Sequence, residues 1–470
     1  MDTQQFDVVI MGGGVAGLSA GTRAAELGLR TVIVEKGAQP DYPCNSRYSG
    51  GIFHIAHRDP RTPAEELQEH IRSVTKNTAD PHLSIALSMA GGGYIHWLQD
   101  KGVRFMQSQS SKKHSAPIAI PVRRLVGGLD WKGRGPDVLL RQLTQAFAAR
   151  GGRLMLDTEG TRLVMREGRC CGLEVRSGNT SIMLEAQAVV LADGGFQANL
   201  ELVEQNIAPK PAQLIQRGAG TGNGAGLTMA REAGAASTEM GSFYGHLLSR
   251  DAFSNDMLWP YPQLDELAVA GIMVDAEGRR FADEGLGGVY LANVVARRAD
   301  PLSTCAIFDS DMWQGAGRYN RIPPNPQMET AGATIHRAGS IAELAAMIGV
   351  PAAALCDTVE TYNAAQKAGT LQQLPTPRSA ADNPAAPLLK APFFAIPACS
   401  GITYTMGGIR IDTHSRVLRE DGSAISGLYA SGANTGGLEG GPTARYVGGL
   451  CRSGTFGKVA AEHIAAAMAK

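Results

Sequence analysis

The chain has 470 residues, of which 44% are hydrophobic and 19% are charged, and a length of this size predicts about two to three domains. Its 44 basic and 44 acidic residues give a formal net charge of zero, which argues against nucleic acid or an anionic membrane surface as a partner. No stretch reaches the roughly 18 apolar residues of a membrane span, so no integral membrane segment is expected. Residues 1–5 lack the basic start and apolar core of a signal peptide.

The cysteines are scattered, and no pair has the Cys-x-x-Cys spacing of a metal or redox site. An odd number of separate cysteines is typical of reduced thiols in a cytoplasmic protein. The sequence therefore predicts a cytoplasmic location and no metal site. The seven positions are Cys44, Cys170, Cys171, Cys305, Cys356, Cys399 and Cys451.

The first 35 residues have the pattern of a strand, a glycine turn, a helix and a second strand. Gly12 allows a tight turn, Gly14 lets a pyrophosphate approach the backbone, and Gly17 lets the helix pack closely on the strand. The helix N-terminus offers unpaired N–H groups to the phosphates. Glu35, at the end of the second strand, is placed to accept hydrogen bonds from an adenosine ribose. This unit predicts a dinucleotide site, and by itself it leaves FAD and NAD(P) open.

A polar, glycine-rich loop follows at residues 45–52. The apolar periodicity then predicts three helices, at about residues 63–76, 81–99 and 136–150. Glycines 91–93 predict a break in the second of these helices. Short β-like runs over residues 153–192 end in a buried strand that leads into Asp193-Gly194-Gly195.

The pattern changes at about residue 241, where irregular loops rich in proline and tyrosine begin. Helical stretches are expected near residues 340–348 and 352–367, before a proline-rich linker. Strand and glycine patterns return at residues 407–412 and 427–432, and a final helix is expected over about 449–469. We therefore expect an α/β chain with a nucleotide-binding domain in two parts, residues 1–240 and 391–470, and an inserted cap at residues 241–390.

Several segments together resemble the flavoproteins of the fumarate reductase and succinate dehydrogenase superfamily, which includes 3-ketosteroid dehydrogenases and tricarballylate dehydrogenase. The resemblance spans nearly the whole chain. The segments that carry it are the loop Asn45-Ser46-Arg47-Tyr48-Ser49-Gly50-Gly51, Gly222-Asn223-Gly224, Gly278-Arg279-Arg280-Phe281-Ala282-Asp283-Glu284, Thr405-Met406-Gly407-Gly408-Ile409 and Gly427 to Gly437. Asp283-Glu284-Gly285 and the Asn45 loop are most similar to the tricarballylate dehydrogenase branch.

The resemblance implies a Rossmann-like, glutathione-reductase-like FAD-binding domain with an inserted α+β capping domain. It also implies that FAD is bound without a covalent link, since no histidine occupies the Asn45 loop and a buried Cys44 thiol is inert. The family glutamate of the last flavin motif is replaced here by Ala433-Asn434. The residues expected to hold FAD are Gly12, Gly14, Ala16, Gly17, Glu35, Lys36, Asn45, Ser46, Ser49, Gly50, Gly51, Ala192, Gly194, Asn223, Gly408, Gly432, Asn434, Gly449 and Leu450.

The same resemblance assigns substrate-binding roles to three residues. His246 matches a substrate histidine, two positions after Tyr244, where relatives often carry glutamine. Arg445 matches the family arginine before a Gly-Gly pair, and a guanidinium suits a carboxylate. Tyr404 stands where fumarate reductases carry histidine, so it can donate a hydrogen bond but carries no charge. Each has a structural alternative: a core histidine, a solvated arginine or a packing tyrosine.

The proton donor departs most from the family pattern. Fumarate reductases place an arginine four residues after the cap glutamate, and this chain has Gly288 there. Tyr290 is the nearest ionisable side chain, and ketosteroid dehydrogenases use a tyrosine in this neighbourhood. We therefore expect Tyr290 to do the acid–base work, with surface packing as its alternative.

These residues predict an FAD-dependent oxidoreductase acting on a carbon–carbon bond next to a carboxylate or ketone, with dehydrogenation favoured. The expected partners are a small carboxylic acid or ketone and a separate electron carrier, either a protein or a quinone, because no haem or iron–sulfur spacing occurs. Three alternatives stay open. They are a 3-ketosteroid-dehydrogenase-like enzyme on a bulky neutral ketone, a fumarate-reductase-like ene-reductase, and a flavin-binding subunit or sensor without catalysis.

Overall fold

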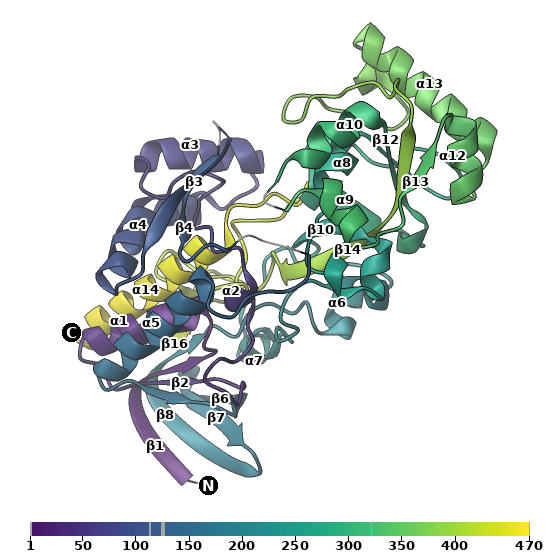
Figure 1. The fold of residues 1–470 in the computed structure, drawn as a ribbon. Helices are drawn as coiled ribbons and strands as arrows, with labels where there is room; N and C mark the ends of the chain where they lie inside the picture. Colours follow the sequence, from purple (N-terminus) through teal and green to yellow (C-terminus); the bar gives the residue numbers. More distant parts are fainter. Residues whose placement is uncertain (1, 112–113, 124–126, 321, 470) are drawn as a thin grey trace.

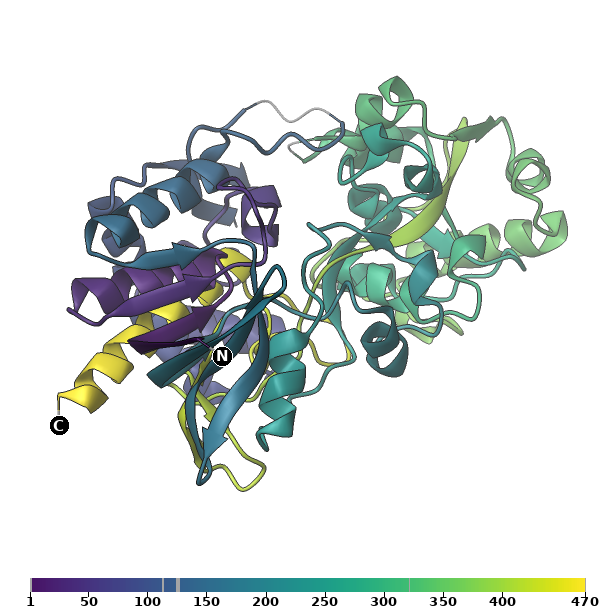
Figure 2. The ribbon, with the colours of Figure 1, turned by 90° about the horizontal axis from the view of Figure 1, so that it is seen from below.

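A computed structural model describes residues 2–111, 114–123, 127–320 and 322–469. The chain forms two lobes (Figure 1), and both termini lie on the lobe that carries the larger sheet. Seen from below in Figure 2, the second lobe stands to one side of the first and does not cover its sheet. The lobes are joined by chain segments that pass between them more than once, as an inserted cap requires.

The larger sheet has eight strands, six of them in the order β15-β16-β8-β1-β2-β5, with β7 paired antiparallel to β8 and β6 paired antiparallel to β7. β1 runs parallel to β2 and β8, and β16 runs parallel to β8. Its strands are β1 (Asp2–Met11), β2 (Thr31–Val34), β5 (Arg153–Met155), β6 (Thr158–Arg166), β7 (Arg169–Ser177), β8 (Thr180–Leu191), β15 (Arg416–Leu418) and β16 (Ala424–Ala430).

Helices pack against the parallel part of this sheet because its central strands are apolar on both faces, as the fully buried β2 illustrates. α1 lies between β1 and β2 in sequence and packs against α14 and α5. The helices of this lobe are α1 (Val15–Glu26), α2 (Asn45–Tyr48), α3 (Ala64–Thr75), α4 (Pro81–Asp100), α5 (Gly135–Ala149), α7 (Ala225–Glu232) and α14 (Gly449–Met468), beside the hairpin β3 (Phe105–Ser111) and β4 (His114–Ala119).

The expected break in the second helix is wrong, because α4 runs unbroken from Pro81 to Asp100. A Cβ at Gly91 would lie 2.7 Å from the Ile55 side chain, and one at Gly92 would lie 3.1 Å from the Pro60 carbonyl oxygen. These glycines let a neighbouring loop pack closely on the helix. Tertiary packing here outweighs the low helix propensity of glycine.

The second lobe is built on a six-stranded sheet in the order β10-β14-β12-β11, with β9 and β13 also paired to β14. The irregular loops expected after residue 241 are therefore wrong in part, because much of this region is regular. Its elements, with the linking helix α6 (Leu200–Asn206), are β9 (Ile215–Gln216), β10 (Phe243–Ser249), α8 (Asp265–Ala270), β11 (Ile272–Val274), α9 (Gly288–Ala296), β12 (Cys305–Phe308), α10 (Ser310–Gln314), α11 (Pro324–Thr330), β13 (His336–Ala338), α12 (Ile341–Ile348), α13 (Ala352–Ala368) and β14 (Phe393–Thr405).

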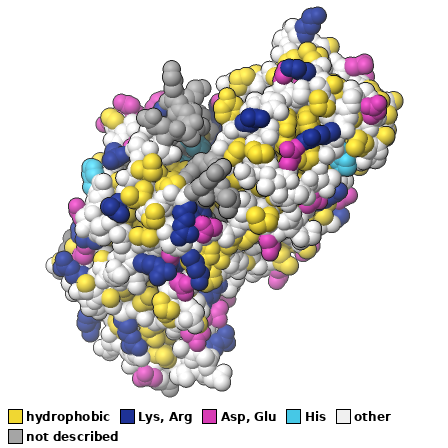
Figure 3. Space-filling model, in the orientation of Figure 1, with side chains coloured by type: hydrophobic (Ala, Val, Ile, Leu, Met, Phe, Trp, Pro, Cys, Tyr) yellow, Lys and Arg dark blue, Asp and Glu magenta, His cyan; other side chains and the backbone are white. Residues whose placement is uncertain are grey.

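β14 is the long central strand of the second sheet, with all but two of its residues buried. It pairs antiparallel with β10 and β12, so the sheet of the inserted lobe extends beyond residue 390 before the chain returns to the first lobe. The expected domain limits at residues 240 and 390 stay predictions. Figure 3 shows one face of the molecule, where side chains of both charges are interspersed over both lobes.

Candidate active site

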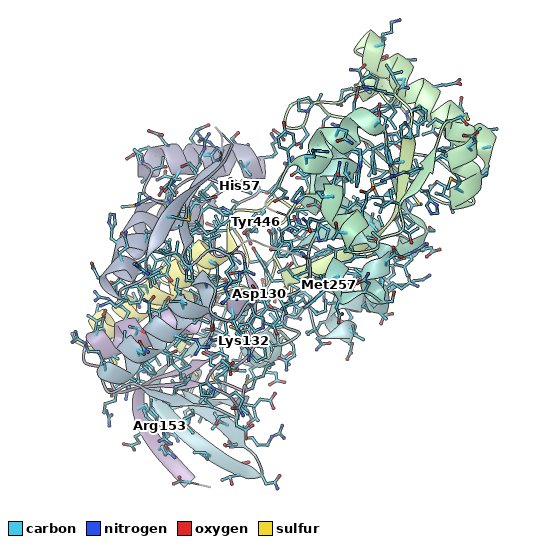
Figure 4. All side chains as sticks on the ribbon, in the orientation of Figure 1. His57, Asp130, Lys132, Arg153, Met257 and Tyr446 are labelled. Carbon is cyan, nitrogen blue, oxygen red and sulfur yellow. The ribbon has the colours of Figure 1, made fainter. Side chains whose placement is uncertain are left out.

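A cavity of about 720 Å³ lies between the two lobes. His57 and Tyr446 both line the cavity, and Figure 4 shows them between the first lobe and the cap. The first lobe contributes glycine-rich turns, and the second lobe contributes aromatic side chains from its strands. A cavity of this size, lined from both lobes, is typical of a ligand site at a domain junction.

The N-terminus of α1 opens onto one end of the cavity. Gly12 has a φ of +104°, which favours glycine, and it makes the turn between β1 and the helix. A Cβ at Gly17 would lie 1.9 Å from the Gly12 carbonyl oxygen, so the close packing of helix on turn requires glycine there. Gly14 begins α1 without a side-chain cap, and no acidic residue lies in the first turn. The positive end of the helix is thereby left for an anion such as a phosphate.

Glu35 is held by the backbone at the same end of the cavity. Its Oε2 accepts a hydrogen bond from the Gly13 N–H at 2.8 Å, and its Oε1 accepts one from the Gly37 N–H at 2.8 Å. The Tyr42 hydroxyl donates to the Gly13 carbonyl at 2.6 Å and packs behind the turn. A fixed carboxylate at the end of β2 suits the two hydroxyl groups of a ribose.

A second helix N-terminus, that of α14, opens onto the other part of the cavity. Gly449 and Leu450 begin this 20-residue helix and line the cavity, again without a side-chain cap or an acidic first turn. Glu439 supports the preceding turn, because its Oε1 accepts from the N–H groups of Val447 (2.9 Å) and Gly448 (2.7 Å). Two uncapped helix N-termini on one cavity fit a cofactor with a pyrophosphate and a ring that becomes negative on reduction.

Most residues expected to hold FAD line this cavity. They are Gly12, Gly14, Ala16, Glu35, Lys36, Asn45, Ser46, Ser49, Gly50, Gly51, Ala192, Gly194, Asn223, Gly432, Gly449 and Leu450. Gly17, Gly408 and Asn434 instead pack behind the lining. A Cβ at Gly408 would lie 2.2 Å from the Asn434 carbonyl oxygen. The Asn434 amide donates to the Leu191 carbonyl at 2.9 Å and to Asp193 Oδ1 at 3.1 Å.

Three tyrosines meet at the end of the cavity nearest the cap. The rings of Tyr244 and Tyr446 stack with centroids 4.1 Å apart, and the ring of Tyr404 lies 5.3 Å from that of Tyr244. The Tyr404 hydroxyl donates to Glu439 Oε2 at 2.9 Å, so this predicted substrate donor already has an acceptor. Burial raises the pKa of Tyr244, and it raises the pKa of Tyr404 and Tyr446 well above 10, so all three are neutral phenols.

His246 connects one of these tyrosines to a carboxylate. Its Nδ1 lies 2.5 Å from Asp265 Oδ2, and its Nε2 lies 3.0 Å from the Tyr244 hydroxyl oxygen. Asp265 is itself fixed, because its Oδ1 accepts from the Leu247 N–H at 2.8 Å. Burial lowers the pKa of His246, and the attraction of Asp265 only partly offsets this effect. The neutral imidazole therefore donates from Nδ1 to Asp265 and accepts at Nε2 from Tyr244.

Gly288, where fumarate reductases carry an arginine, lies against this arrangement. A Cβ at Gly288 would lie only 2.1 Å from Asp265 Cγ, so Asp265 occupies the space that any side chain at position 288 would need. Tyr290, two residues further on α9, is half-buried and lies outside the residues that line the cavity. Its expected acid–base role stays a prediction without support from its position.

Arg445 also lies outside the lining residues. Its Nε donates to Thr443 Oγ1 at 2.9 Å, and its Nη1 lies 3.6 Å from Asp382 Oδ2. The adjacent residue, Tyr446, lines the cavity instead, and its hydroxyl oxygen accepts from the Gly449 N–H at 3.2 Å. The Tyr446 proton is therefore left to donate to another acceptor.

Sequence reasoning did not single out Asp265, Glu439 or Tyr446. A period of two would have placed Tyr244 and His246 on the same face of a strand. Asp265 lies 19 positions after His246, and only the packing of α8 on β10 brings it to the histidine. The spacing between Tyr446 and the Gly-Gly pair was the available signal for that residue.

A family model described as an FAD binding domain matches residues 7–443. The chain belongs to this FAD-binding family. FAD is therefore its cofactor, as the residues predicted, and burial raises the pKa of the nearby Cys44 to about 11, which fits non-covalent binding. Among the described residues, no cluster of three or more His, Cys, Asp or Glu side chains is placed to hold a metal ion.

Two relatives and one solved structure are similar to this chain over most of its length. NADH:acrylate oxidoreductase of Vibrio harveyi is 31% identical over 385 residues, which cover 78% of this chain and only 35% of that protein. Fumarate reductase (cytochrome) of Shewanella frigidimarina is 27% identical over 476 residues, which cover 98% of this chain and 77% of that protein. The structure of 3-ketosteroid delta1-dehydrogenase from Sterolibacterium denitrificans aligns with a TM-score of 0.76 and 21% identity, covering 98% of this chain and 100% of that one.

These matches confirm the predicted superfamily and the two-lobed FAD-binding fold with a capping domain. The chain is an FAD-dependent oxidoreductase that acts on CH–CH groups. No helix in the described part of the chain is long and apolar enough to cross a membrane.

Proposed function

We propose that this chain dehydrogenates a carbon–carbon single bond next to a carboxylate or ketone. FAD, when bound, supplies the hydride chemistry, and the side chains of the chain handle the proton and the activating oxygen. The observation that carries the proposal is the Asp265–His246–Tyr244 arrangement on the cavity. Its neutral histidine is set to accept a proton, which is the role that dehydrogenation requires.

In this mechanism the Tyr244 hydroxyl removes a proton from the substrate carbon and passes its own proton to His246 Nε2. The hydrogen bond of 3.0 Å between these atoms provides the path. The imidazolium that forms is stabilised by Asp265, whose carboxylate lies 2.5 Å from Nδ1. The arrangement follows the logic of a nucleophile, a base and an orienting carboxylate, applied here to a phenol.

Tyr446 supports the same reaction from the other side of the stacked rings. Its hydroxyl oxygen accepts from the Gly449 N–H, so its proton is free to donate to the carbonyl or carboxylate oxygen of the substrate. A fixed donor beside the N-terminus of α14 stabilises the enolate-like charge that forms when the carbon loses its proton. Tyr404, whose hydroxyl is bound to Glu439, positions the neighbouring ring.

The glycine at position 288 favours dehydrogenation over fumarate reduction. The arginine that supplies the proton in fumarate reductases has no counterpart at this position, and Asp265 occupies the space. The cap and loop motifs resemble the tricarballylate dehydrogenase branch, whose reaction runs in the proposed direction. A tricarballylate-type activity of this chain stays a prediction. The second candidate is an ene-reductase, which the names of the acrylate and fumarate relatives favour.

Two further proposals concern the surroundings of the enzyme. We propose that electrons leave through a separate acceptor, a protein or a quinone, because the sequence carries no haem or iron–sulfur spacing. We also propose a cytoplasmic location, which the seven free thiols support.

An anaerobic screen of the purified holoprotein tests the proposed reaction. Saturated acids and ketones are expected to bleach the flavin absorbance, and their unsaturated counterparts are expected to restore it more slowly. If only unsaturated compounds exchange electrons with the protein, the ene-reductase candidate replaces the dehydrogenase. If neither class does so, both candidates are wrong and the flavin-binding subunit is the better description.

A further inference from the structure

Among the described residues, Lys36, Arg452 and Arg217 are the lysine and arginine side chains that line the cavity. The Lys36 ammonium donates a hydrogen bond to the Thr221 carbonyl, beside the glycine-rich turns. Arg452 forms an ion pair with Glu439, at 3.3 Å between Nη2 and Oε2. Within the described ranges, neither Lys36 nor Arg217 has a carboxylate in ion-pair distance. Arg217 differs from Lys36 because it is buried, whereas Lys36 is exposed.

Arg217 is only 7% exposed, so its charge is buried at the edge of the cavity. Its backbone N–H donates to the Ile402 carbonyl at 2.7 Å, which fixes the residue beside β14. The side chain is fixed as well, because Nε donates to the Pro260 carbonyl at 3.0 Å and Nη1 donates to Thr403 Oγ1 at 3.0 Å. The guanidinium lies over the Tyr261 ring, 4.8 Å from its centroid.

These contacts leave part of the guanidinium unused. A guanidinium has five N–H donors, and the hydrogen bonds to Pro260 and Thr403 use two of them. The remaining three include both N–H groups of Nη2. A buried charge without a counter-ion is costly, and a nearby ring and two neutral acceptors offset only part of that cost. An anion in the cavity would complete the site.

The position of Arg217 relates it to the proposed proton path. Arg217, Tyr244 and His246 line the same cavity. Arg217 donates to Thr403 of β14, and β14 pairs with β10, the strand that carries Tyr244 and His246. The positive charge of Arg217 lowers the pKa of both Tyr244 and His246. An anion on Arg217 therefore lies beside the group that takes the proton. Glu266 also lines this part of the cavity, and burial raises its pKa.

We propose that Arg217 binds the carboxylate of the substrate in a bidentate manner, and that the substrate is a monocarboxylic acid. This inference rests on the proposed dehydrogenation and names its substrate class. One unpaired guanidinium supports one carboxylate, whereas the tyrosine-lined remainder of this end suits an uncharged body. A dicarboxylate would leave its second charge among Tyr244, Tyr404 and Tyr446, which carry no charge.

Matched acids and amides test the inference on the holoprotein. The probes are propanoate, butanoate and 3-phenylpropanoate as flavin reductants, and acrylate, crotonate and cinnamate as oxidants of the reduced protein, each beside its primary amide. We expect the acids to exchange electrons more efficiently than their amides. Equal or better rates with the amides would overturn the carboxylate site while leaving the proposed function in place. If no acid, amide or ketone exchanges electrons with the flavin, both proposals are wrong.

Substitution of Arg217 tests whether this residue causes the preference for acids over amides. In Arg217→Gln, we expect the efficiency with acids to fall about 10- to 100-fold, the contribution of a charged hydrogen bond, and the efficiency with amides to change less than about threefold. Arg217→Lys keeps the charge without the planar fork and is expected to lie between these values. Arg166→Gln, which removes an exposed arginine paired with Glu185 on the first lobe, is the matched control and is expected to behave as the parent protein.

The FAD content and flavin spectrum of each variant separate a substrate site from a cofactor site. Retention of FAD with loss of the acid preference supports the inference. Loss of FAD from Arg217→Gln and Arg217→Lys, or an equal fall with acids and amides, would show that Arg217 serves the cofactor or the fold. The acid and amide rates of the parent protein decide the substrate class even if Arg217→Gln does not fold.

Discussion

The two ends of the cavity are built in different ways. The nucleotide end consists mainly of backbone, with glycine turns and a helix N-terminus presenting N–H groups. The cap end consists of side chains, in which tyrosines, a histidine and a carboxylate contact one another across different strands and helices. In the proposed mechanism, the first end binds the dinucleotide that all FAD enzymes share, whereas the second selects the bond that reacts.

The comparison predicts that a change at the nucleotide end abolishes the cofactor site altogether. Gly17→Val places a Cβ 1.9 Å from the Gly12 carbonyl oxygen, and we expect a loss of roughly 3 kcal/mol in the free energy of unfolding together with loss of FAD. Thermal unfolding and the flavin absorbance of the purified protein measure both effects. Gly93→Ala is the control, since a Cβ there has open space in α4 and is expected to stabilise the helix by about 0.5–1 kcal/mol.

A change at the cap end is expected to remove catalysis and leave FAD bound. Tyr244→Phe removes the hydroxyl that contacts His246, and flavin reduction is expected to slow by about 10²- to 10⁴-fold. Stopped-flow reduction with the best saturated acid measures the rate. The same assay on Tyr290→Phe decides between the two tyrosines: a large loss there with retained activity in Tyr244→Phe would return the acid–base role to Tyr290.

The contact between Gly288 and Asp265 gives a smaller and more specific effect. Gly288→Ala brings a Cβ to 2.1 Å from Asp265 Cγ, so the carboxylate must move away from His246. We expect about a 10²-fold slower turnover, similar to that of Asp265→Asn, with unchanged FAD content. If the two substitutions act on one interaction, the double variant is no slower than either single variant. Additive losses would show that Gly288 does not act through Asp265.

The smallest effect concerns pH. Burial lowers the pKa of His246 below the ordinary value of 6.5, so the imidazole is neutral above that pH and accepts the Tyr244 proton. As the pH falls through the lowered pKa, His246 becomes charged, and the rate of flavin reduction is expected to fall about tenfold per unit. The free energy of unfolding also decreases as the pH falls, because protonation of a buried neutral histidine opposes folding. His246→Gln is expected to lack this acid limb; a limb that persists unchanged would assign it to another group.

The difference between the two ends also explains what the sequence could predict. Gly12, Gly17 and Glu35 act through positions in one local unit, where spacing along the chain determines spacing in the fold. Asp265 acts on His246 because a helix of the cap packs against a strand, and no local pattern records that contact. The unbroken helix across Gly91 has the same cause, since the neighbouring loop is distant in sequence.

The resemblance to a known superfamily had a similar limit. It led to the strand with His246 and to the turn before α14, where Tyr446 lines the cavity and the predicted Arg445, one residue earlier, does not. Such a shift changes the chemistry of the site while the backbone pattern stays recognisable. Side-chain identity at the cap end therefore had to come from the structure.

The second lobe carries the proposed proton path, because Tyr244 and His246 lie on β10 and Asp265 begins α8. The glycine turns and helix N-termini that are expected to hold FAD lie in the other lobe. The residues proposed for catalysis and those expected to hold FAD are thus largely on separate parts of the fold. A chimaera that grafts the segment from β9 to β14, together with Tyr446, onto a homologous flavin scaffold should therefore transfer the bond selectivity.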